Sequence, residues 1–566
     1  MTAPQLKVQI QGQGVVSADN LNSYLSSCNT FADLRAFIGV PGIEVFSRGR
    51  SAINDGFGGL FYWDASGLGP DDNATLIVPS GTTVGCWVRS LFSQSLSFFA
   101  DVASIAALRA IPPVTGSIYY VSGYSTEGDG GEGFFLCTSV NPGADNGGTI
   151  LHSNTPNVYY VRQFVGPFSV KWFGAKGDGV TDDAPAINAT FDAAYAANFS
   201  GVFFPSVAVK YGIKSKINFK ASFGGSDQNG VIIAAISGFS GTYMLDFNGA
   251  AAGQARQIDN VIFDVRALGT GTSVKVTGSS SAGAGGSNFL LTATNVRMLS
   301  ASTSQAPLAM TSSTAEPGAL TFSNWVNLAI SAPRCISIGN NQDNILFVNG
   351  EFDNGAGGSS VPVEMFSGAG NVSFLNCGFE FVDASQAFFH IGSGQAIFDN
   401  CFLESTANIA NTPWGFLCNQ NGTSGVPETR LTIRNLTLNV AYTGASADQA
   451  LVRVNINDTA APNYTQYIEI DGVFKSSGGN TPWDTVFNLS SASGSATGPV
   501  TLTINNVDEF AKLSKSATGS SSSGANVKAH LQGWWRGTVL NHTAPAPAAG
   551  SAYTWTWQLP AASFSA

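Results

Sequence analysis

A nine-residue phrase returns at intervals along the middle of the chain. VSFLNCGFE occupies residues 372–380, and close variants begin 27 residues earlier (ILFVNGEFD, 345–353) and 24 residues later (AIFDNCFLE, 396–404). Repeats with a period of about 20–50 residues are typical of solenoids, in which each repeat forms one turn stacked on the next. The phrase therefore predicts a β-coil.

The central Asn or Asp of the phrase extends this pattern over residues 202–510. Asn suits a tight bend between strands because it tolerates left-handed backbone and its amide can form a ladder with the next turn. The predicted bends are Asp264, Asn295, Asn324, Asn349, Asn376, Asn400, Asn435, Asp471 and Asn506. The predicted inward side chains, two residues before each bend, are Ile262, Ala293, Phe322, Phe347, Phe374, Phe398, Ile433 and Ile504. At the Asp471 bend this position is Glu469, and a one-residue slip would bring in Ile470 instead.

Two weak copies of a small module precede the coil. FADLRAFIG (31–39) aligns with IAALRAIPP (105–113) at an offset of 74 residues, and the same offset aligns Asp55 with Asp129. Each copy has a short helical opening, a Gly-rich turn and apolar β segments. We found no titratable pair that recurs in both copies, which favours a structural role over a catalytic one.

Composition excludes several functional classes. Only 11% of the residues are charged, against about 25% in typical domains, and the formal net charge of -11 argues against nucleic-acid binding. No apolar run reaches the ~18 residues of a membrane span. We expect no metal and no cofactor, because no ligand spacing appears. The seven cysteines are scattered, which predicts buried thiols in a reducing compartment.

The first residues, MTAPQLKVQIQGQG, show no basic and then apolar secretion signal. We therefore expect synthesis in a cytoplasm, with release by lysis or as part of a larger particle.

The segment VKWFGAKGDGVTDDAPAINATFDAAYAA (170–197) predicts a helix over 181–197. Thr181 is the expected N-cap, and Asp182 and Asp183 in the first turn favour the helix dipole. The Asp-Gly pairs lack the spacing and closing Glu of a calcium loop, so capping is the preferred interpretation.

Part of this segment, WFGAKGDGVTDDAPAINA, resembles the N-terminal cap of right-handed parallel β-helix proteins of the pectate-lyase-like superfamily, in the form found in bacteriophage tailspikes. The matching positions are Phe173, Gly174, Ala175, Gly177, Asp178, Gly179, Thr181, Asp182, Asp183 and Ile187. With the coil, the resemblance covers about residues 170–510. It implies a homotrimeric virion protein that attaches to the phage tail or baseplate through its N-terminal modules. The expected partner is a bacterial surface polysaccharide, which the protein binds and cleaves.

The expected fold is mainly β, a right-handed parallel β-helix with small N-terminal α+β modules and a short C-terminal β domain. The expected boundaries are 1–98 and 99–167 for the two modules, 168–512 for the β-helix, and 513–566 for a Ser/Gly-rich linker and a Trp-rich tail.

Three consecutive turns carry a carboxylate at the fourth position after the bend, namely Asp353, Glu380 and Glu404. Strands on adjacent turns are about 4.8 Å apart, so at least one of these groups should hold its proton more tightly than in water. Glycoside hydrolysis needs one protonated acid and one ionised carboxylate, and this position supplies both. The other turns place Leu268, Leu299, Leu328, Asn439, Lys475 and Phe510 there.

Further candidates surround this position. Asp383 is a possible additional member of the same site. Trp325, Trp414 and Trp483 are candidate sugar-stacking rings, although packing in the core is the better explanation for any single one.

Three alternatives remain open at this point. The acids can be solvated residues on a polar face, with the active groove elsewhere. The protein can be a polysaccharide lyase, with His390 as the base and Arg334 neutralising a uronate. It can also be a receptor-binding spike that holds glycan without cutting it.

Overall fold

A computed structural model describes residues 26–535 apart from short gaps and longer ones at 90–100, 247–254, 277–289, 311–321, 421–428, 457–465, 492–499 and 517–526. The chain divides into two compact units, Met1–Val165 and Gly166–Ala566.

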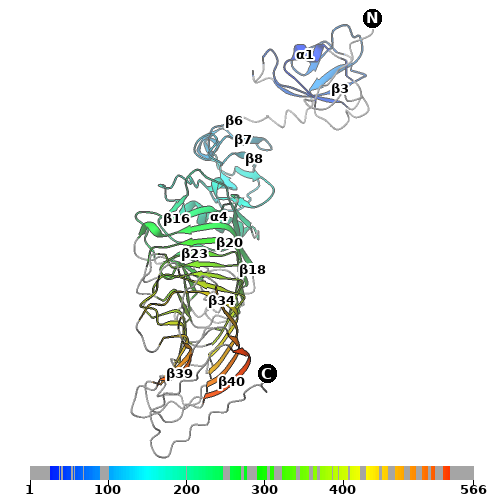
Figure 1. Ribbon diagram of the computed structural model, residues 1–566. Helices are drawn as coiled ribbons and strands as arrows, with labels where there is room; N and C mark the ends of the chain where they lie inside the picture. Colours follow the sequence, from blue (N-terminus) through cyan, green and yellow to red (C-terminus); the bar gives the residue numbers. More distant parts are fainter. Residues whose placement is uncertain are drawn as a thin grey trace, which may run out of the picture. The chain divides into compact units, whose positions relative to one another are not determined.

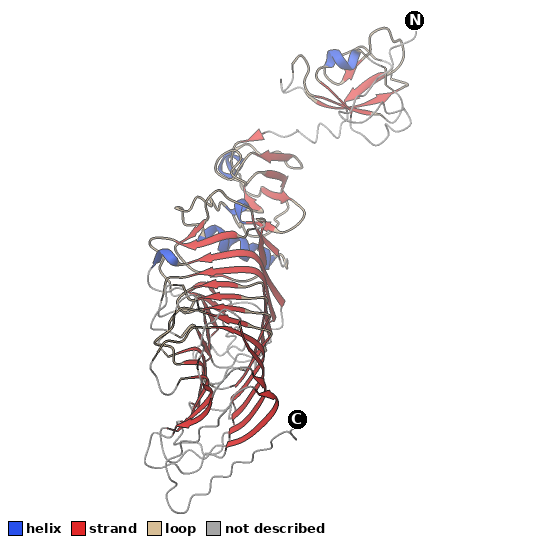
Figure 2. Ribbon diagram, in the orientation of Figure 1, coloured by secondary structure: helices blue, strands red, loops and turns tan. Residues whose placement is uncertain are grey.

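The second unit is a parallel β-coil (Figures 1 and 2). One turn consists of β24 (Ile336–Ile338), β25 (Ile345–Val348) and β26 (Glu351–Asp353), after which β27 (Val363–Met365) pairs in parallel with β24. The turns stack into one sheet of 19 strands and one of 11 strands. The predicted mainly β, parallel-coil architecture is confirmed.

The remaining strands of the larger sheet are β11 (Phe168–Ser169), β12 (Gly201–Phe204), β13 (Tyr211–Ile213), β15 (Ser222–Gly225), β16 (Val231–Ala235), β18 (Ala255–Asp264), β20 (Leu290–Leu299), β22 (Phe322–Val326), β23 (Ala329–Ser331), β28 (Asn371–Leu375), β29 (Gly378–Glu380), β31 (Gly394–Asp399), β32 (Phe402–Glu404), β34 (Thr429–Asn439), β36 (Gln466–Lys475), β38 (Val500–Val507) and β40 (Val527–Trp535). Those of the smaller sheet are β14 (Ile217–Asn218), β17 (Tyr243–Asp246), β19 (Ser273–Val276), β21 (Leu308–Met310), β30 (Ala387–Ile391), β33 (Trp414–Gln420), β35 (Ala450–Ile456), β37 (Thr485–Ser491) and β39 (Lys512–Ser516). The 3-10 helices η2 (Val170–Phe173) and η3 (Arg266–Leu268) complete the unit together with helix α4 (Ala184–Ala196).

Asparagines with left-handed backbone form the bends of the larger sheet. Their φ values lie between 50° and 55°, at Asn260, Asn295, Asn327, Asn349, Asn376, Asn400 and Asn435. Several of their amides form a ladder, with Asn400 Nδ2 donating to Asn376 Oδ1 at 2.8 Å and Asn327 Nδ2 donating to Asn295 Oδ1 at 2.8 Å. The structural role predicted for the recurring asparagines is confirmed at Asn295, Asn349, Asn376, Asn400 and Asn435.

Three of the predicted bends were wrong. The bend near Asp264 is Asn260, because β18 passes through the bend and ends at Asp264. Asn324 lies within β22, and the bend follows at Asn327. At Asp471 the left-handed residue is Gly472 (φ 73°), since glycine adopts this conformation without steric cost.

Aromatic rings stack inside the coil, two residues before the bends. Phe374 lies between Phe347 and Phe398, with ring centroids 4.8 Å apart on both sides. Strand pairing extends this inward column to Ile258 and Trp325 at one end, in place of the predicted Ile262 and Phe322. Ile470 occupies the column on the Gly472 turn, so the slip considered for Glu469 is confirmed.

Helix α4 begins later than predicted. Its N-cap is Asp183 rather than Thr181, whose hydroxyl instead donates to Asp178 Oδ2 at 2.7 Å. The Asp183 side chain is buried and accepts backbone N–H groups of Lys176 at 2.6 Å and Gly212 at 3.2 Å. The GDGVTDD motif therefore ties the helix to the first turns of the coil.

The coil continues beyond the boundary expected at residue 512. Strand β39 pairs with β37, and β40 pairs with β38 from Val527 to Trp535. The GWW of the predicted tail thus belongs to the final strand of the larger sheet. The YTWTWQLP segment lies outside the described residues.

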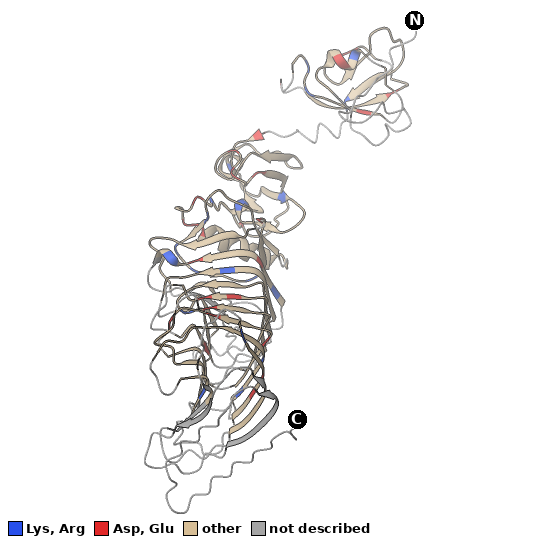
Figure 3. Cartoon of the chain, viewed as in Figure 1, with Lys and Arg blue, Asp and Glu red and all other residues tan. Residues whose placement is uncertain are grey.

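Charge is sparse over the coil, and most of its ribbon is tan in Figure 3. All seven cysteines are free thiols, six of them buried. Cys377 and Cys401 lie in the core on adjacent turns, as predicted. In the described part of the chain, no helix has the length and hydropathy of a membrane span.

The first unit contains two small sheets with the same strand order. The first is β1-β2-β3-β5-β4, built from β1 (Ser26–Cys28), β2 (Glu44–Ser47), β3 (Gly59–Asp64), β4 (Leu76–Ile77) and β5 (Cys86–Arg89), with helix α1 (Phe31–Arg35). The second is β6-β7-β8-β10-β9, built from β6 (Asp101–Val102), β7 (Ile118–Val121), β8 (Gly133–Thr138), β9 (Ile150–His152) and β10 (Tyr159–Gln163), with helix α3 (Ile105–Ala110). Each has its own core, which agrees with the predicted repeat.

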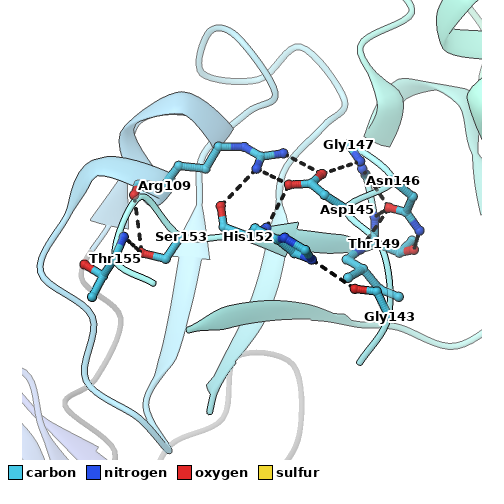
Figure 4. Close-up of polar contacts among 11 residues, drawn as sticks. Arg109, Gly143, Asp145, Asn146, Gly147, Thr149, His152, Ser153 and Thr155 are labelled. Carbon is cyan, nitrogen blue, oxygen red and sulfur yellow. Dashed lines mark hydrogen bonds and ion pairs between the residues drawn. The ribbon is translucent and has the colours of Figure 1, made fainter. Parts of the chain in front are cut away.

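A titratable pair does recur in these modules, contrary to the sequence analysis. Arg35 pairs with Asp71, and 74 residues later Arg109 pairs with Asp145. Figure 4 shows that Asp145 also accepts the backbone N–H groups of Gly147 at 2.9 Å and His152 at 2.8 Å. The alignment missed the pair because its members are 36 residues apart in each copy. These contacts fasten a loop to the helix, so the role is structural.

Candidate functional site

Asp353, Glu380 and Glu404 stack in register on three adjacent strands. Asp353 on β26 pairs with Glu380 on β29, which pairs with Glu404 on β32. Phe352, Phe379 and Leu403, one position earlier, lie in the core. Because side chains alternate along a strand, the three carboxylates point outward, and each is partly exposed. We call this set the carboxylate column.

The neighbours of the carboxylate column differ from the predicted ones. In register with it lie Ser331 on the preceding turn and Asn439 on the following turn. Leu299 lies two turns before the column, as predicted. Leu268 and Leu328 do not belong there, because the bends before them were misplaced, and Lys475 pairs with Leu438. Phe510 lies outside the described residues. Of the three leucines expected at this position, only Leu299 lies there.

The carboxyl group of Glu380 lies among other negative charges. Burial and the negative charges of Asp353, Glu404 and Glu351 raise the pKa of the Glu380 carboxyl above its ordinary value. Like charges on adjacent strands disfavour ionisation in this way. The Glu380 carboxyl therefore holds its proton more tightly than a carboxyl free in water does.

The two outer carboxylates are oriented by hydrogen bonds. Asp353 Oδ2 accepts the Ser331 hydroxyl at 3.2 Å, and its Oδ1 accepts the backbone N–H of Gly355 at 2.6 Å. Glu404 Oε2 accepts the Asn439 amide at 3.3 Å. Donors of this kind hold a carboxylate in a fixed position, which suits a partner for a protonated acid.

A second outward position accompanies the column on the same strands. Glu351, Gly378 and Phe402 pair across β26, β29 and β32. A Cβ at Gly378 would meet nothing within 4 Å, and Phe402 is 36% exposed. An aromatic face beside carboxylates suits a sugar ring. Sequence analysis missed Phe402, although its place two residues before Glu404 puts it on the same face.

Asp383 has a structural explanation. Its carboxylate accepts the Asn411 backbone N–H at 2.8 Å, the Asn411 side-chain amide at 2.6 Å and the Thr412 hydroxyl at 2.9 Å. It thereby fastens a loop of the next turn, and these donors account for the residue without a role in chemistry.

The three tryptophans are distributed differently from the prediction. Trp325 and Trp483 are buried in the core, where Trp325 stacks near Phe347 and Trp483 Nε1 donates to Thr412 O at 3.0 Å. Neither can hold a sugar, because a fully buried ring offers no face. Trp414 is partly exposed, and the Arg453 guanidinium lies 5.3 Å from its ring centre.

His390 and Arg334 meet at a carboxylate that sequence analysis missed. Glu364 forms an ion pair with Arg334, and its Oε1 lies 3.4 Å from His390 Nδ1. We call these three residues the Glu364 cluster. They lie at the smaller sheet, apart from the strands of the carboxylate column. The alternation Val363-Glu364-Met365 was the signal available, since both neighbours are core residues.

Burial and the Arg334 charge lower the pKa of His390, and burial lowers the pKa of Arg334. Among the described residues, no group of three or more His, Cys, Asp or Glu side chains is arranged to bind a metal ion.

Two family models match the chain. Residues 27–92 and 101–165 each match the phage tail protein small four-stranded beta-sheet domain. Residues 167–344 match the model described as rhamnogalacturonase A/epimerase, pectate lyase-like. The second match ends before the carboxylate column, so it assigns no role to those residues.

A curated relative, mannuronan C5-epimerase AlgE3 of Azotobacter vinelandii, is 56% identical over 41 residues, which is 7% of this chain and 2% of the relative. Among solved structures, a tailspike of Acinetobacter phage vb_AbaP_AS12 has 13% identity and a TM-score of 0.47, with 77% of this chain and 75% of that chain covered. The tailspike of Acinetobacter baumannii phage AM24 has 14% identity and a TM-score of 0.42, with coverage of 75% and 67%.

The enzymatically active domain of bacteriophage CBA120 tailspike protein 4 has 15% identity and a TM-score of 0.36, with 90% of this chain covered but only 63% of that chain. The family matches place two phage-tail β-sheet domains before a pectate-lyase-like domain. The pectate-lyase-like match falls on the stacked parallel strands of the second unit. Residues 27–165 of the chain therefore contain two domains similar to the phage tail small β-sheet domain, and residues 167–344 are similar to the pectate-lyase-like family.

Proposed function

We propose that this protein hydrolyses a bacterial surface polysaccharide, a capsule, exopolysaccharide or O-antigen, at the carboxylate column. The observation that carries the proposal is the in-register stacking of Asp353, Glu380 and Glu404 on three adjacent turns, facing outward. A column of like charges destabilises the fold, so its presence calls for a function. Cleavage of a glycosidic bond uses this combination of a protonated and an ionised carboxyl group.

Glu380 is the proposed general acid, because its raised pKa favours the protonated form that donates to the leaving oxygen. Asp353 or Glu404 is the nucleophile or the base that activates water. Adjacent strands are about 4.8 Å apart, close to the carboxyl separation of about 5–5.5 Å in retaining enzymes. Pairing Glu380 with either neighbour therefore favours retention, whereas Asp353 with Glu404 spans two strand spacings and favours inversion.

Reducing ends released from the host polysaccharide test this proposal. Glu380→Gln keeps the shape of the side chain and removes the acid, so we expect at least a 10²-fold loss of cleavage with glycan binding retained. Glu469→Gln is the matched control, because Glu469 lies on β36 of the same sheet, two turns beyond Glu404, in an exposed ion pair with Arg434. Its cleavage rate should stay within about threefold of the wild type.

Full cleavage by Glu380→Gln would refute the assignment. Binding without any cleavage by the wild-type protein would favour a non-catalytic receptor-binding spike. Product with ultraviolet absorbance would identify elimination instead of hydrolysis.

The proposed assembly is a homotrimer on the virion, attached to the phage tail through residues 27–165, the range covered by the two phage-tail domain matches. Partly exposed apolar side chains follow the outer face of the larger sheet over four turns. They are Val326, Leu346, Val348, Leu375 and Ile397. Such a stripe favours cover by another copy of the chain. Light scattering should give three times the monomer mass, and Leu375→Glu should lower it.

A further inference from the structure

The exposed phenylalanines of the second unit lie in one row. Among the described residues of this unit they are Phe402 and Phe474, which are 36% and 44% exposed. Phe402 on β32 pairs with Thr437 on β34, which pairs with Phe474 on β36. The two rings therefore occupy the same outward position on the coil, two turns apart. We call Phe402, Thr437 and Phe474 the phenyl row.

The phenyl row runs beside the carboxylate column. Phe402 precedes Glu404 by two residues on β32, and the alternation of side chains along a strand places both on the outer face. On the preceding turn the row meets Gly378, where a Cβ would have nothing within 4 Å. The space between Phe402 and Glu380 is therefore not filled by a side chain at residue 378.

The backbone of its own turn positions the Phe474 ring. A Cβ at Gly472 would lie 3.3 Å from Phe474 Cε2, so an edge of the ring rests against this bend. The residue nevertheless keeps 44% of its surface exposed. An aromatic ring that is both supported and exposed loses little freedom when a ligand packs on it.

The regular placement of the two rings favours a saccharide ligand. A single exposed apolar side chain needs no explanation, because much of any folded surface is apolar. Two rings in register with a threonine hydroxyl between them form a repeating pattern instead. The C–H faces of pyranose rings pack on aromatic rings, and their hydroxyl groups form hydrogen bonds with a side chain such as Thr437.

Charge argues against a second copy of the chain as the occupant of this face. A copy seated on the phenyl row would also cover Glu380 and Glu404, and carboxylates removed from water without a cation carry a large desolvation penalty. A glycan leaves these groups hydrated and offers them hydroxyl donors. The apolar stripe proposed above for contacts between copies lies on β22, β25, β28 and β31, across the Asn bends from β32.

The same charges select the class of sugar. Glu351, Asp353, Glu380 and Glu404 are outward residues of β26, β29 and β32, and the other outward residues of these three strands are Gly378 and Phe402. An acidic sugar beside Phe402 would therefore meet like charges without a compensating cation on these strands. An uncharged sugar meets no such repulsion.

We propose that the phenyl row is the binding strip of the carboxylate column, on which an uncharged stretch of polysaccharide lies along the coil axis. Phe402 packs on the sugar next to the column. Phe474 packs on a sugar about 14 Å from Glu380, because three strand spacings separate β29 from β36. The inference rests on the proposed saccharide substrate but not on which carboxylates cleave it.

Calorimetry on the full-length Glu380→Gln chain measures binding without cleavage. The probe is an octasaccharide prepared from the host surface polysaccharide by partial acid hydrolysis and size separation. Adding Phe474→Ala or Phe402→Ala should weaken binding of this probe at least threefold each, because each removes one stacking face. The double variant Phe402→Ala/Phe474→Ala should lose about tenfold. Unchanged affinity in the double variant would overturn the proposal.

A charged form of the probe tests the sugar class. Oxidation of the primary hydroxyl groups of the octasaccharide to carboxylates should weaken its binding at least tenfold at low salt. Equal affinity for the two forms would overturn the assignment of the strip to uncharged sugars.

The matched control is Leu290→Ala, which removes an exposed apolar side chain from β20 of the same sheet, away from the phenyl row. It should change octasaccharide affinity by less than about twofold. Light scattering of the double variant should give the same mass as wild type, whereas a lower mass would assign the row to an interface between copies and overturn the proposal.

A kinetic measurement separates binding from chemistry. In the otherwise wild-type chain, Phe474→Ala should raise KM for the polysaccharide and leave kcat unchanged, because its ring lies far from the reacting bond. Full cleavage by Glu380→Gln together with weaker binding in the phenyl variants would contradict only the proposed hydrolytic site. Lost cleavage in Glu380→Gln together with unchanged binding in the phenyl variants would contradict only the binding strip.

Discussion

The carboxylate column and the Glu364 cluster are two polar groups on outer faces of the same coil, and they differ in how their charges are compensated. In the column, three like charges occupy adjacent turns with hydroxyl and amide donors as neighbours. In the cluster, one carboxylate contacts an arginine and lies beside a histidine. Parallel strands of the same kind therefore carry uncompensated like charges on one face and a compensated ion pair on another. The residue type at each outward position decides which of the two arrangements forms.

The largest expected effect comes from the core that lies beneath both faces. Phe374→Ala removes a ring stacked between Phe347 and Phe398 and should lower the free energy of unfolding by about 3–5 kcal/mol. Urea unfolding measures this loss. The cavity should disturb the neighbouring carboxylate column more than the Glu364 cluster, and an unchanged unfolding midpoint would show that the stack contributes little.

Removing the carboxylate of the Glu364 cluster should destabilise the coil. Glu364→Gln leaves Arg334 partly enclosed without its ion-pair partner, at a cost of about 2–3 kcal/mol. Glu469→Gln breaks the exposed pair with Arg434 and should cost less than about 1 kcal/mol. The comparison fails if both variants shift the thermal midpoint equally.

A substitution at the bend before Glu380 should affect the carboxylate column selectively. Asn376 has φ 53°, and Asn376→Ala should cost about 1–2 kcal/mol because a Cβ disfavours left-handed backbone. Asn376→Gly should recover much of this stability. We expect hydrolysis to fall about tenfold in Asn376→Ala, since Glu380 follows four residues later. Loss of the β-sheet signal in circular dichroism of Asn376→Ala would instead point to global unfolding.

The smallest expected effect is a difference in pH dependence. The folded-state pKa of Glu380 is raised, so its contribution to stability is fully present below the unfolded pKa and is lost as pH rises through the folded pKa. The stability of wild type relative to Glu380→Gln should therefore fall as pH rises across the carboxyl range.

The folded-state pKa of His390 is lowered, so its contribution is present above the unfolded pKa of about 6.5 and is lost as pH falls through the folded pKa. Wild type relative to His390→Gln should gain stability as pH rises toward neutrality. Denaturation at a series of pH values measures both slopes, and slopes of the same sign would contradict the comparison.

The sequence was sufficient to predict the carboxylate column because Asp353, Glu380 and Glu404 each follow a correctly identified Asn by four residues. The same rule failed at Leu328, since Asn324 lies on a strand and the bend is Asn327. Two asparagines three residues apart cannot be distinguished by residue type alone. The burial of Trp325 was missed for the same reason.

The Glu364 cluster could not be predicted in this way. Glu364 lies on a three-residue strand that follows a connection from β26, and no repeated residue marks its register. Its partners Arg334 and His390 lie on the turns before and after it, 30 and 26 residues away. Only the pairing of β24, β27 and β30 brings them together.

The most direct test is a crystal structure of Glu380→Gln with an oligosaccharide of the host surface polysaccharide bound. The account predicts that a glycosidic oxygen lies within hydrogen-bond distance of residue 380, with Asp353 or Glu404 beside the same sugar. An oligosaccharide bound on another face, with none of the three residues in reach, would contradict it.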